Sequence, residues 1–400
     1  MNRLKWLALA GACALALPAW AERLSIEQAV ARALAAHPLL VAQDARRDVA
    51  IGQANLDALR PALRLGLDVE NVLGSGAVSG LSGSETTLRA TYTVERGDKA
   101  RLRGARGAAL VAVEALGRDS TRAEIAFVAR TRYLALAYAQ AAMGLAEEAL
   151  SIARALRADV RLRGARGAAS VADEAQAEVA LARAELAAAQ AQDDADAARA
   201  TLVALWDGEA ATAAALDPLP TLPLISEPSI AARRVAAQRA LLDSERQLAK
   251  AQALADIDID IGVRRFEALN DQALVLSASL PLGQAPRSAL LQARIAAQER
   301  ALDADHAAAA AAQAQQLLDL RQQLARAERE YAGLGDLIAK ADGAAALQRE
   351  AYERGAAPLS ARLLGEQQAQ QLRGERLAAA YRHHSLFAQW QRAIELGATP

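Results

Sequence analysis

Two parts of the chain alternate apolar and polar residues with a period of two. The alternating runs cover residues 63–70, 88–94, 257–263 and 274–280. A glycine-rich loop, "LGSGAVSGLSGS", separates the first two runs, and a short polar loop separates the last two. Strands with this pattern have one apolar and one mostly polar side, and these are close to membrane-spanning length. We therefore predict two β-hairpins, at about residues 62–95 and 256–282.

Proline positions show where long helices can form. No proline lies between Pro61 and Pro218 or between Pro286 and Pro358. Both intervals are rich in alanine, leucine, glutamate, glutamine and arginine, which are strong helix formers, and proline inside a helix is costly. We predict long amphipathic helices with small faces that pack closely on one another.

The nonapeptide "RLRGARGAA" occurs twice, with starts 60 residues apart at Arg101 and Arg161. We interpret this spacing as the length of one helix rather than as a repeat period. The first copy begins a helix after the strands and the second ends it, which gives a rod of roughly 90 Å. Gly164 and Gly167 then allow the chain to reverse.

Matching features recur about half a chain apart. Their offsets are 186 to 194 residues, close to half of the 379 residues that follow residue 21. The pairs are Pro38 and Pro228, Leu63 and Ile257, Gly97 and Gly283, and Arg166 and Arg354. We predict an α+β, mostly helical fold in which a unit of helix, hairpin, long helix, turn and helix is duplicated. The parts are a first repeat over 22–215 with a turn at about 164–170, a linker over 216–228, and a second repeat over 229–400 with a turn at about 354–359.

The N-terminus has the features of a secretory signal peptide. A basic start is followed by an apolar run from Trp6 to Leu17 and by a small-x-small site that ends at Ala21. We predict a signal peptide over residues 1–21. The alternative is lipidation of Cys13, the one cysteine of the chain. After cleavage at Ala21, neither disulfides nor thiolate metal sites could support the fold.

Charge and histidine placement narrow the possible functions. Removal of residues 1–21 leaves 44 basic against 47 acidic side chains, a net charge of −3, so we expect no nucleic-acid partner.

No later apolar run reaches 18 residues, so no membrane-spanning helix is predicted. His383 and His384 are adjacent, and on a helix they point about 100° apart, while His37 and His306 are isolated. We therefore predict no metal site, no cofactor and no catalytic constellation.

Four strands cannot form a closed barrel alone, because small barrels begin at eight strands. Several copies of the chain must therefore combine their hairpins. A trimer would supply 12 strands, and its helices would form a hollow cylinder that continues the pore.

The order of segments resembles the TolC-like outer membrane efflux proteins over nearly the whole chain after the signal. The resemblance rests on "LSIEQAVARALAAHP", a hairpin, "RGAASVADEAQAEVALARAEL", the linker, a hairpin ending in "SLPLG", and "RGAAPLSARLLGEQQAQ". The stretch from "ENVLGSG" to "ETTLRATYTVERGDKARLRGAR" is most similar to the cobalt-zinc-cadmium, or heavy-metal, resistance branch.

This resemblance implies a homotrimer with a 12-stranded barrel in the outer membrane of a Gram-negative bacterium and an α-helical tunnel in the periplasm. It implies docking to a periplasmic adaptor (membrane fusion) protein and an inner-membrane pump, of the resistance-nodulation-division type. The expected cargo is heavy-metal cations; organic toxins, drugs or a secreted protein are the alternatives. No catalysis and no cofactor are implied.

The resemblance also assigns roles to residues at the two helix turns. The family's Val-Gly-Leu-like docking turn matches this chain at the glycines and departs from it at the flanking residues. The adaptor-docking positions are Arg166, Gly167, Ala168 and Ser170 in the first turn, and Arg354, Gly355, Ala356 and Pro358 in the second. Among the gate candidates, Asp173 matches a gating carboxylate of the family and Tyr352 matches its aromatic partner. Aspartates at the family's narrowest point would fall at Ala361 and Leu364 of this chain. Either the gate here is less acidic, or Glu174, Arg354 and Arg362 take that role.

Asp68, Glu70, Asp258 and Asp260 would face the pore if the apolar alternates face lipid. Threefold repetition would then give acidic rings that favour cations. The simpler interpretation is that these carboxylates keep the lumen hydrated.

Other classes of protein fit less of the pattern. A periplasmic adaptor needs β-rich domains that flank one helical hairpin, and a coiled-coil structural protein does not explain four alternating strands. An enzyme needs a pocket-forming constellation, and this sequence shows no nucleophile–base arrangement and no glycine-rich phosphate loop.

Overall fold

The computed structural model describes residues 23–35, 37–206, 212–213, 216, 218–222 and 228–397. The predicted signal peptide and Cys13 lie outside the described residues. The first half contains β1 Arg23–Leu24, α1 Ile26–Ala35, α2 Pro38–Asp57, β2 Arg64–Glu70, the 3-10 helix Gly76–Val78, β3 Glu85–Val94, α3 Lys99–Gly164, α4 Val171–Val203 and β4 Thr212–Ala213. The second half contains α5 Ile230–Ala251, β5 Ile257–Phe266, β6 Asp271–Ser279, α6 Gln284–Glu353 and α7 Leu359–Leu396.

The prediction of a mostly helical chain with two strand hairpins is confirmed. Helices α3 and α6 have 66 and 70 residues, and each follows a hairpin. Pro286 lies in the first turn of α6, where its missing N–H removes no intrahelical hydrogen bond. Each hairpin is preceded by a shorter helix, α2 or α5, so the order of elements occurs twice.

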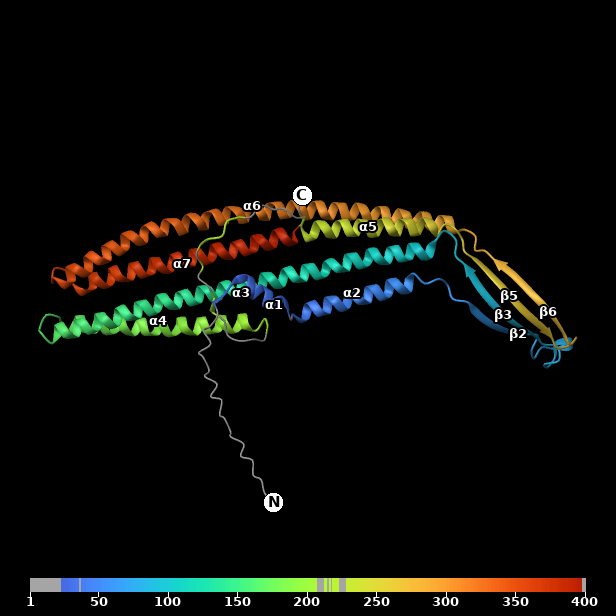
Figure 1. Ribbon diagram of the computed structural model, residues 1–400, viewed down its shortest axis with the longest axis horizontal. Helices are drawn as coiled ribbons and strands as arrows, with labels where there is room; N and C mark the ends of the chain where they lie inside the picture. Colours follow the sequence, from blue (N-terminus) through green and yellow to red (C-terminus); the bar gives the residue numbers. More distant parts are fainter. Residues whose placement is uncertain are drawn as a thin grey trace, which may run out of the picture. The chain divides into compact units, whose positions relative to one another are not determined.

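The four long strands form one antiparallel sheet in the order β2-β3-β5-β6 (Figure 1). Strand β3 of the first hairpin pairs with β5 of the second, with Leu88 opposite Val263 and Thr91 opposite Asp260. Because directly opposite residues lie on the same face of a sheet, this register places most polar alternates on one face and most large apolar alternates on the other. The two repeats therefore form a single sheet.

Two compact units can be distinguished, and each draws on both repeats. Unit 1 comprises the described parts of Met1–Ala36, Ala126–Thr221 and Gln323–Ala388. Unit 2, which contains the sheet, comprises those of His37–Ile125, Leu222–Gln322 and Gln389–Pro400. The helices α3, α6 and α7 contribute residues to both units.

The core of unit 1 is built around α3. Leu136 is fully buried there, and Leu24 and Leu202 pack in the same cluster. The Tyr133 hydroxyl donates a hydrogen bond of 2.8 Å to the Leu24 carbonyl. Strands β1 and β4, which pair in parallel beside this cluster, have two residues each. No periodicity exists over two residues, so the sequence did not predict them.

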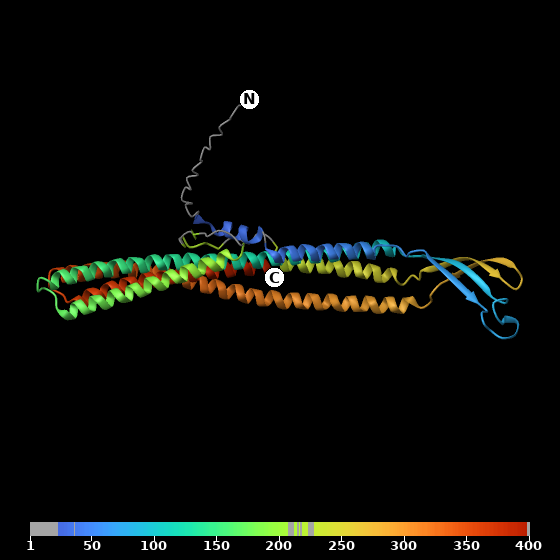
Figure 2. The same ribbon diagram turned by 90° about the horizontal axis from the view of Figure 1, so that it is seen from below.

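In unit 2, α2 lies against the start of α3 at very short range (Figure 2). A Cβ atom added to Gly107 would come within 2.8 Å of the Ala54 Cα, and one added to Gly104 would touch Ala58 at 3.4 Å. The glycines in the first copy of the nonapeptide therefore allow close helix packing. Those in the second copy lie at the end of α3 and in the turn that follows it.

Gly107→Ala tests this packing, with Gly144→Ala in the same helix as the matched control. Alanine normally stabilises a helix interior by about 0.5–1 kcal/mol over glycine. A Cβ at Gly144 meets nothing within 4 Å, so this variant should gain that amount. Gly107→Ala should instead lose about 1–3 kcal/mol, because the Ala54 backbone must move. Thermal unfolding followed by circular dichroism measures both; equal stabilisation of the two variants would contradict the close approach.

Candidate functional site

The polar face of the sheet carries a network of ion pairs. Arg264 contacts Glu70 at 3.1 Å and Glu85 at 3.0 Å, and it belongs to β5 while its partners belong to β2 and β3. Arg89 pairs with Asp68. Arg89 thus links two neighbouring strands, Arg264 links three, and each arginine offsets the charge of a carboxylate.

The remaining two predicted carboxylates lie on the same face, nearer the helices. Asp258 accepts a hydrogen bond from Thr93 and lies 3.6 Å from Arg64. Asp260 accepts hydrogen bonds from the hydroxyls of Thr91 and of Ser277, the latter at 2.9 Å. The structure therefore brings Asp68, Glu70, Asp258 and Asp260 to one face, as the alternation predicts. Sequence reasoning did not identify Arg64, Arg89 and Arg264 as partners of these carboxylates, although all three arginines lie at polar positions of the alternating strands.

The opposite face of the sheet is apolar and exposed. Leu65 and Leu274 are 73% and 75% exposed, and large apolar side chains cover the four strands of this face. The others that are largely exposed are Leu67, Val69, Leu88, Tyr92, Ile261, Val263 and Leu276. A contiguous apolar patch of this kind marks an interaction surface.

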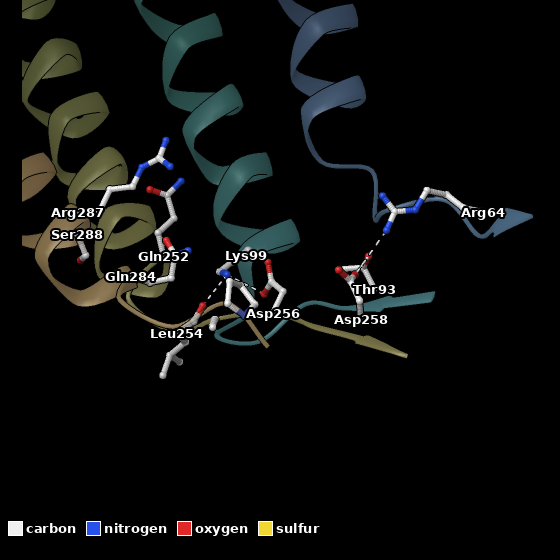
Figure 3. A pocket seen from close by; sticks show the side chains of 12 residues that line it. Arg64, Thr93, Lys99, Gln252, Leu254, Asp256, Asp258, Gln284, Arg287 and Ser288 are labelled. Atoms are coloured by element: carbon white, nitrogen blue, oxygen red, sulfur yellow. Dashed lines mark hydrogen bonds and ion pairs between the residues drawn. The ribbon is translucent and has the colours of Figure 1, made fainter. Parts of the chain in front are cut away.

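Lys99 and Arg103, in the first turns of α3, bind the segments that connect helices to strands. The buried Lys99 ammonium donates hydrogen bonds of 2.7 Å to the Leu254 carbonyl, just beyond α5, and to Asp256 (Figure 3). Arg103 donates to the Leu59 carbonyl, just beyond α2, at 2.7 Å, and pairs with Glu95. A cation at a helix C-terminus satisfies carbonyls left over there and opposes the negative end of the helix dipole.

A pocket of about 420 Å³ lies beside Lys99, between the ends of the helices and the sheet (Figure 3). Its polar lining includes Arg64, Asp258, Gln284 and Arg287. Lys99 is already bonded to Asp256, and Arg64 lies near Asp258. We therefore regard this region as a structural junction. None of its contacts was predicted from the sequence.

The two helix turns have the same backbone geometry. After α3, Gly167 has a φ of 69° and the Ala168 N–H donates to the Arg163 carbonyl at 2.8 Å. After α6, Gly355 has a φ of 74° and the Ala356 N–H donates to the Ala351 carbonyl at 2.8 Å. This is the Schellman ending of a helix, in which glycine adopts the left-handed conformation at no steric cost.

Ser170 and Asp173 form a capping box at the start of α4. The Ser170 hydroxyl accepts the Asp173 N–H at 3.1 Å, and the Asp173 carboxylate accepts the Ser170 N–H at 2.9 Å. The Ser170 hydroxyl also donates to the Asp173 carboxylate at 2.7 Å. The hydrogen bonds that this carboxylate accepts, first from the Ser170 backbone and then from the Ser170 hydroxyl, lower the pKa of Asp173. The Glu174 carboxylate lies beside Gly164 of the preceding helix end. These two gate candidates thus lie at a helix start, and Pro358 directly precedes α7 in the other turn.

Tyr352 lies between two guanidinium groups. Arg163 and Arg362 approach its ring centroid at 4.7 and 5.4 Å, and the side chain packs against Leu156 and Leu359. Burial is the main cause that raises the pKa of Tyr352, so the phenol stays neutral at ordinary pH. The structure therefore brings the gate candidates Tyr352 and Arg362 together.

Two carboxylates hold these arginines in place. Asp159 lies 3.0 Å from Arg163 and 3.8 Å from Arg362, and Glu366 lies 3.1 Å from Arg362. We call Asp159, Arg163, Tyr352, Arg362 and Glu366 the tip cluster. It joins the end of α3, the end of α6 and the start of α7. Sequence reasoning missed Asp159, Arg163 and Glu366. Arg163 and Glu366 lie three and four residues from the predicted residues Arg166 and Arg362, which is the only signal that the sequence offered for them, and Asp159 had none.

The described residues contain no group of three or more histidine, cysteine or acidic side chains that could hold a metal ion. His383 is buried, and burial followed by the neighbouring His384 lowers its pKa. In the part of the chain that the structure describes, no helix combines the length and the apolar character needed to cross a membrane.

No family model and no curated protein matches the chain. Solved structures do match it. CusC, described in terms of transmembrane channel formation, has a TM-score of 0.73 at 14% identity, over 93% of this chain and 92% of CusC. The outer membrane protein VceC of Vibrio cholerae has a TM-score of 0.70 at 17% identity, over 93% of this chain and 96% of VceC. The open outer membrane channel MtrE of Neisseria gonorrhoeae has a TM-score of 0.69 at 17% identity, over 94% and 89%.

These similarities show that the chain has the α+β tunnel fold of outer membrane channel proteins. None of the descriptions names a transported substrate, so the heavy-metal branch stays a prediction.

Ser170→Ala tests the capping box. The variant should lower the stability of the start of α4 by about 0.5–2 kcal/mol, because the Asp173 N–H loses its acceptor. Hydrogen exchange of the amides at 171–174 measures this, and Ser151→Ala in the middle of α3 is the control. A lowered carboxyl pKa contributes stability that is present above the unfolded pKa, about 3.9, and is lost as pH falls through the folded value. The difference between wild type and variant should therefore shrink in acid; a pH-independent difference would contradict the role of the Asp173 carboxylate.

Proposed function

We propose that the chain is the outer-membrane channel-tunnel of a tripartite efflux system in a Gram-negative bacterium. It serves as the passive exit duct, works as a homotrimer, and has no catalytic activity and no cofactor. The observation that carries this proposal is the likeness to outer membrane channel structures, which for CusC extends over more than nine-tenths of both chains. Efflux, partners and cargo are inferences from that likeness and from the sequence.

The sheet supports the trimer. Strands β2 and β6 are the edges of the described four-stranded sheet, and an edge strand leaves a row of backbone groups unpaired. Pairing of β6 in one copy with β2 in the next removes both edges, and three copies give 12 strands in a closed sheet. The exposed apolar face then meets lipid, and the polar face meets water.

The side chains on the polar face are consistent with a water-filled pore that has a small preference for cations. Six carboxylates lie on this face, together with the three arginines: Asp68, Glu70, Glu85, Asp258, Asp260 and Asp271. Asp260 accepts hydrogen bonds from the hydroxyl groups of Thr91 and Ser277, whereas an arginine lies beside each of Asp68, Glu70, Glu85 and Asp258. We infer that the carboxylates mainly keep the pore hydrated and that a small cation preference comes from Asp260.

The pump, rather than the channel, selects the transported substrate. With no metal-ligand cluster in the described residues, heavy-metal cations would pass through the duct without binding. Organic toxins, drugs or a secreted protein are the alternative cargo. A periplasmic adaptor docked at the helix turns and an inner-membrane pump of the resistance-nodulation-division type complete the proposed system.

The oligomer and its conductance test the proposal. Protein extracted from outer membranes in detergent should have three times the mass of the processed chain and should form discrete ion-conducting channels in planar lipid bilayers. The controls are membranes from a deletion strain, treated identically. A soluble periplasmic monomer without conductance would contradict the proposal and favour an adaptor or a coiled-coil structural protein.

Tyr352→Ala tests the tip cluster as the gate. The cluster holds the ends of α3 and α6 and the start of α7 together, so its loss should favour an open state. At about 1 kcal/mol for each cation–π contact, loss of both should raise the open-to-closed ratio roughly thirtyfold. Tyr352→Phe keeps the ring and is the matched control. Single-channel recordings in which both variants behave like wild type would exclude a gating role for Tyr352.

A further inference from the structure

The two helix turns present nearly the same surface twice. Residues 164–169 read Gly-Ala-Arg-Gly-Ala-Ala and residues 354–357 read Arg-Gly-Ala-Ala. In each turn the arginine directly precedes the glycine of a Schellman ending, and the arginine and glycine are exposed. Both turns belong to unit 1 and lie at the same end of its helices (Figures 1 and 2). The contact of Arg163 with the Tyr352 ring joins the helices that precede the turns.

Within these apex segments, arginine is the one side chain larger than a methyl group. A partner can therefore approach the glycine and alanine backbone closely and still meet a long cation in each turn. Arginine at a helix C-terminus is also well placed, because the negative end of the helix dipole favours a positive charge.

Neither Arg166 nor Arg354 makes a strong ion pair among the described residues. Among the described residues no carboxylate pairs with the side chain of Arg166, which is exposed. Arg354 pairs with Glu350 one turn earlier, and the two side chains are 70% and 52% exposed. Such exposed pairs within a helix contribute little stability and can exchange for another carboxylate.

The nearby acidic side chains lie in the helices rather than at the apices. Asp173 is held by Ser170 in the capping box, and Glu174 lies beside Gly164. Glu353 ends α6. The apices themselves therefore present positive charge in both repeats.

On this basis, and resting on the proposed channel function, we propose that the docking partner is a protein whose helical turn carries Asp or Glu side chains that bind Arg166 and Arg354. A guanidinium binds a carboxylate through two parallel hydrogen bonds, which gives direction as well as attraction. Because both turns share one geometry and one sequence, the same partner motif fits each of them.

Site-specific photo-crosslinking from Ala168 tests this inference in cells that contain the native partners. The crosslinked peptide identifies the partner turn, and the double variant Arg166→Glu with Arg354→Glu should reduce its yield at least about tenfold, through the loss of charged hydrogen bonds. The control is Arg161→Glu, at an exposed arginine in the last turn of α3, five residues before Arg166, and it should leave the yield unchanged. Replacing the partner's acidic residues with arginine should restore crosslinking to the double variant.

Three outcomes would overturn the inference: no crosslinked protein, a crosslinked turn without Asp or Glu, or an undiminished yield from the double variant. Bilayer conductance separates these from failure of the channel proposal. The double variant should still form conducting trimers, since neither arginine belongs to the sheet or to the tip cluster. Absence of conductance from the wild-type protein would instead contradict the channel function itself.

Discussion

One face of the four-stranded sheet is apolar and largely exposed, and a single copy of the chain cannot remedy this. Hydrophobic surface of that extent is unfavourable in water, and strands β2 and β6 still have unpaired edges. The proposed trimer in lipid satisfies both needs at once. The ion pairs on the polar face link the strands to one another. The contacts of Lys99 attach the sheet to the long helix α3.

Local patterns made much of the fold predictable. A strand or a helix is specified by the periodicity of its own residues, so alternation identified all four long strands and the proline-free intervals identified α3 and α6. Contacts between distant residues were not accessible in the same way. The pairing of β3 with β5 joins residues more than 160 positions apart, and two-residue strands such as β1 and β4 contain no period to detect.

The candidate sites show the same division. Alternation within a strand puts Asp68 with Glu70 and Asp258 with Asp260, but the register through β3 decides that both pairs share one face and that arginines lie beside them. Tyr352 and Arg362 were proposed from resemblance, but Arg163 joins them only through packing between α3 and α6. The repeated nonapeptide shows this as well, because the same glycine of its two copies has two structural roles. Gly107 allows close helix packing, and Gly167 allows the chain to reverse.

The junction at Lys99 makes the two repeats unequal. Lys99 and Arg103 belong to the first repeat, and Lys99 binds groups of the second. With the offset of 186 that relates Gly97 to Gly283, their counterparts are Ala285 and Ala289, which cannot supply the same cations. The halves have therefore become complementary rather than interchangeable, and six copies of either half alone could not rebuild this junction.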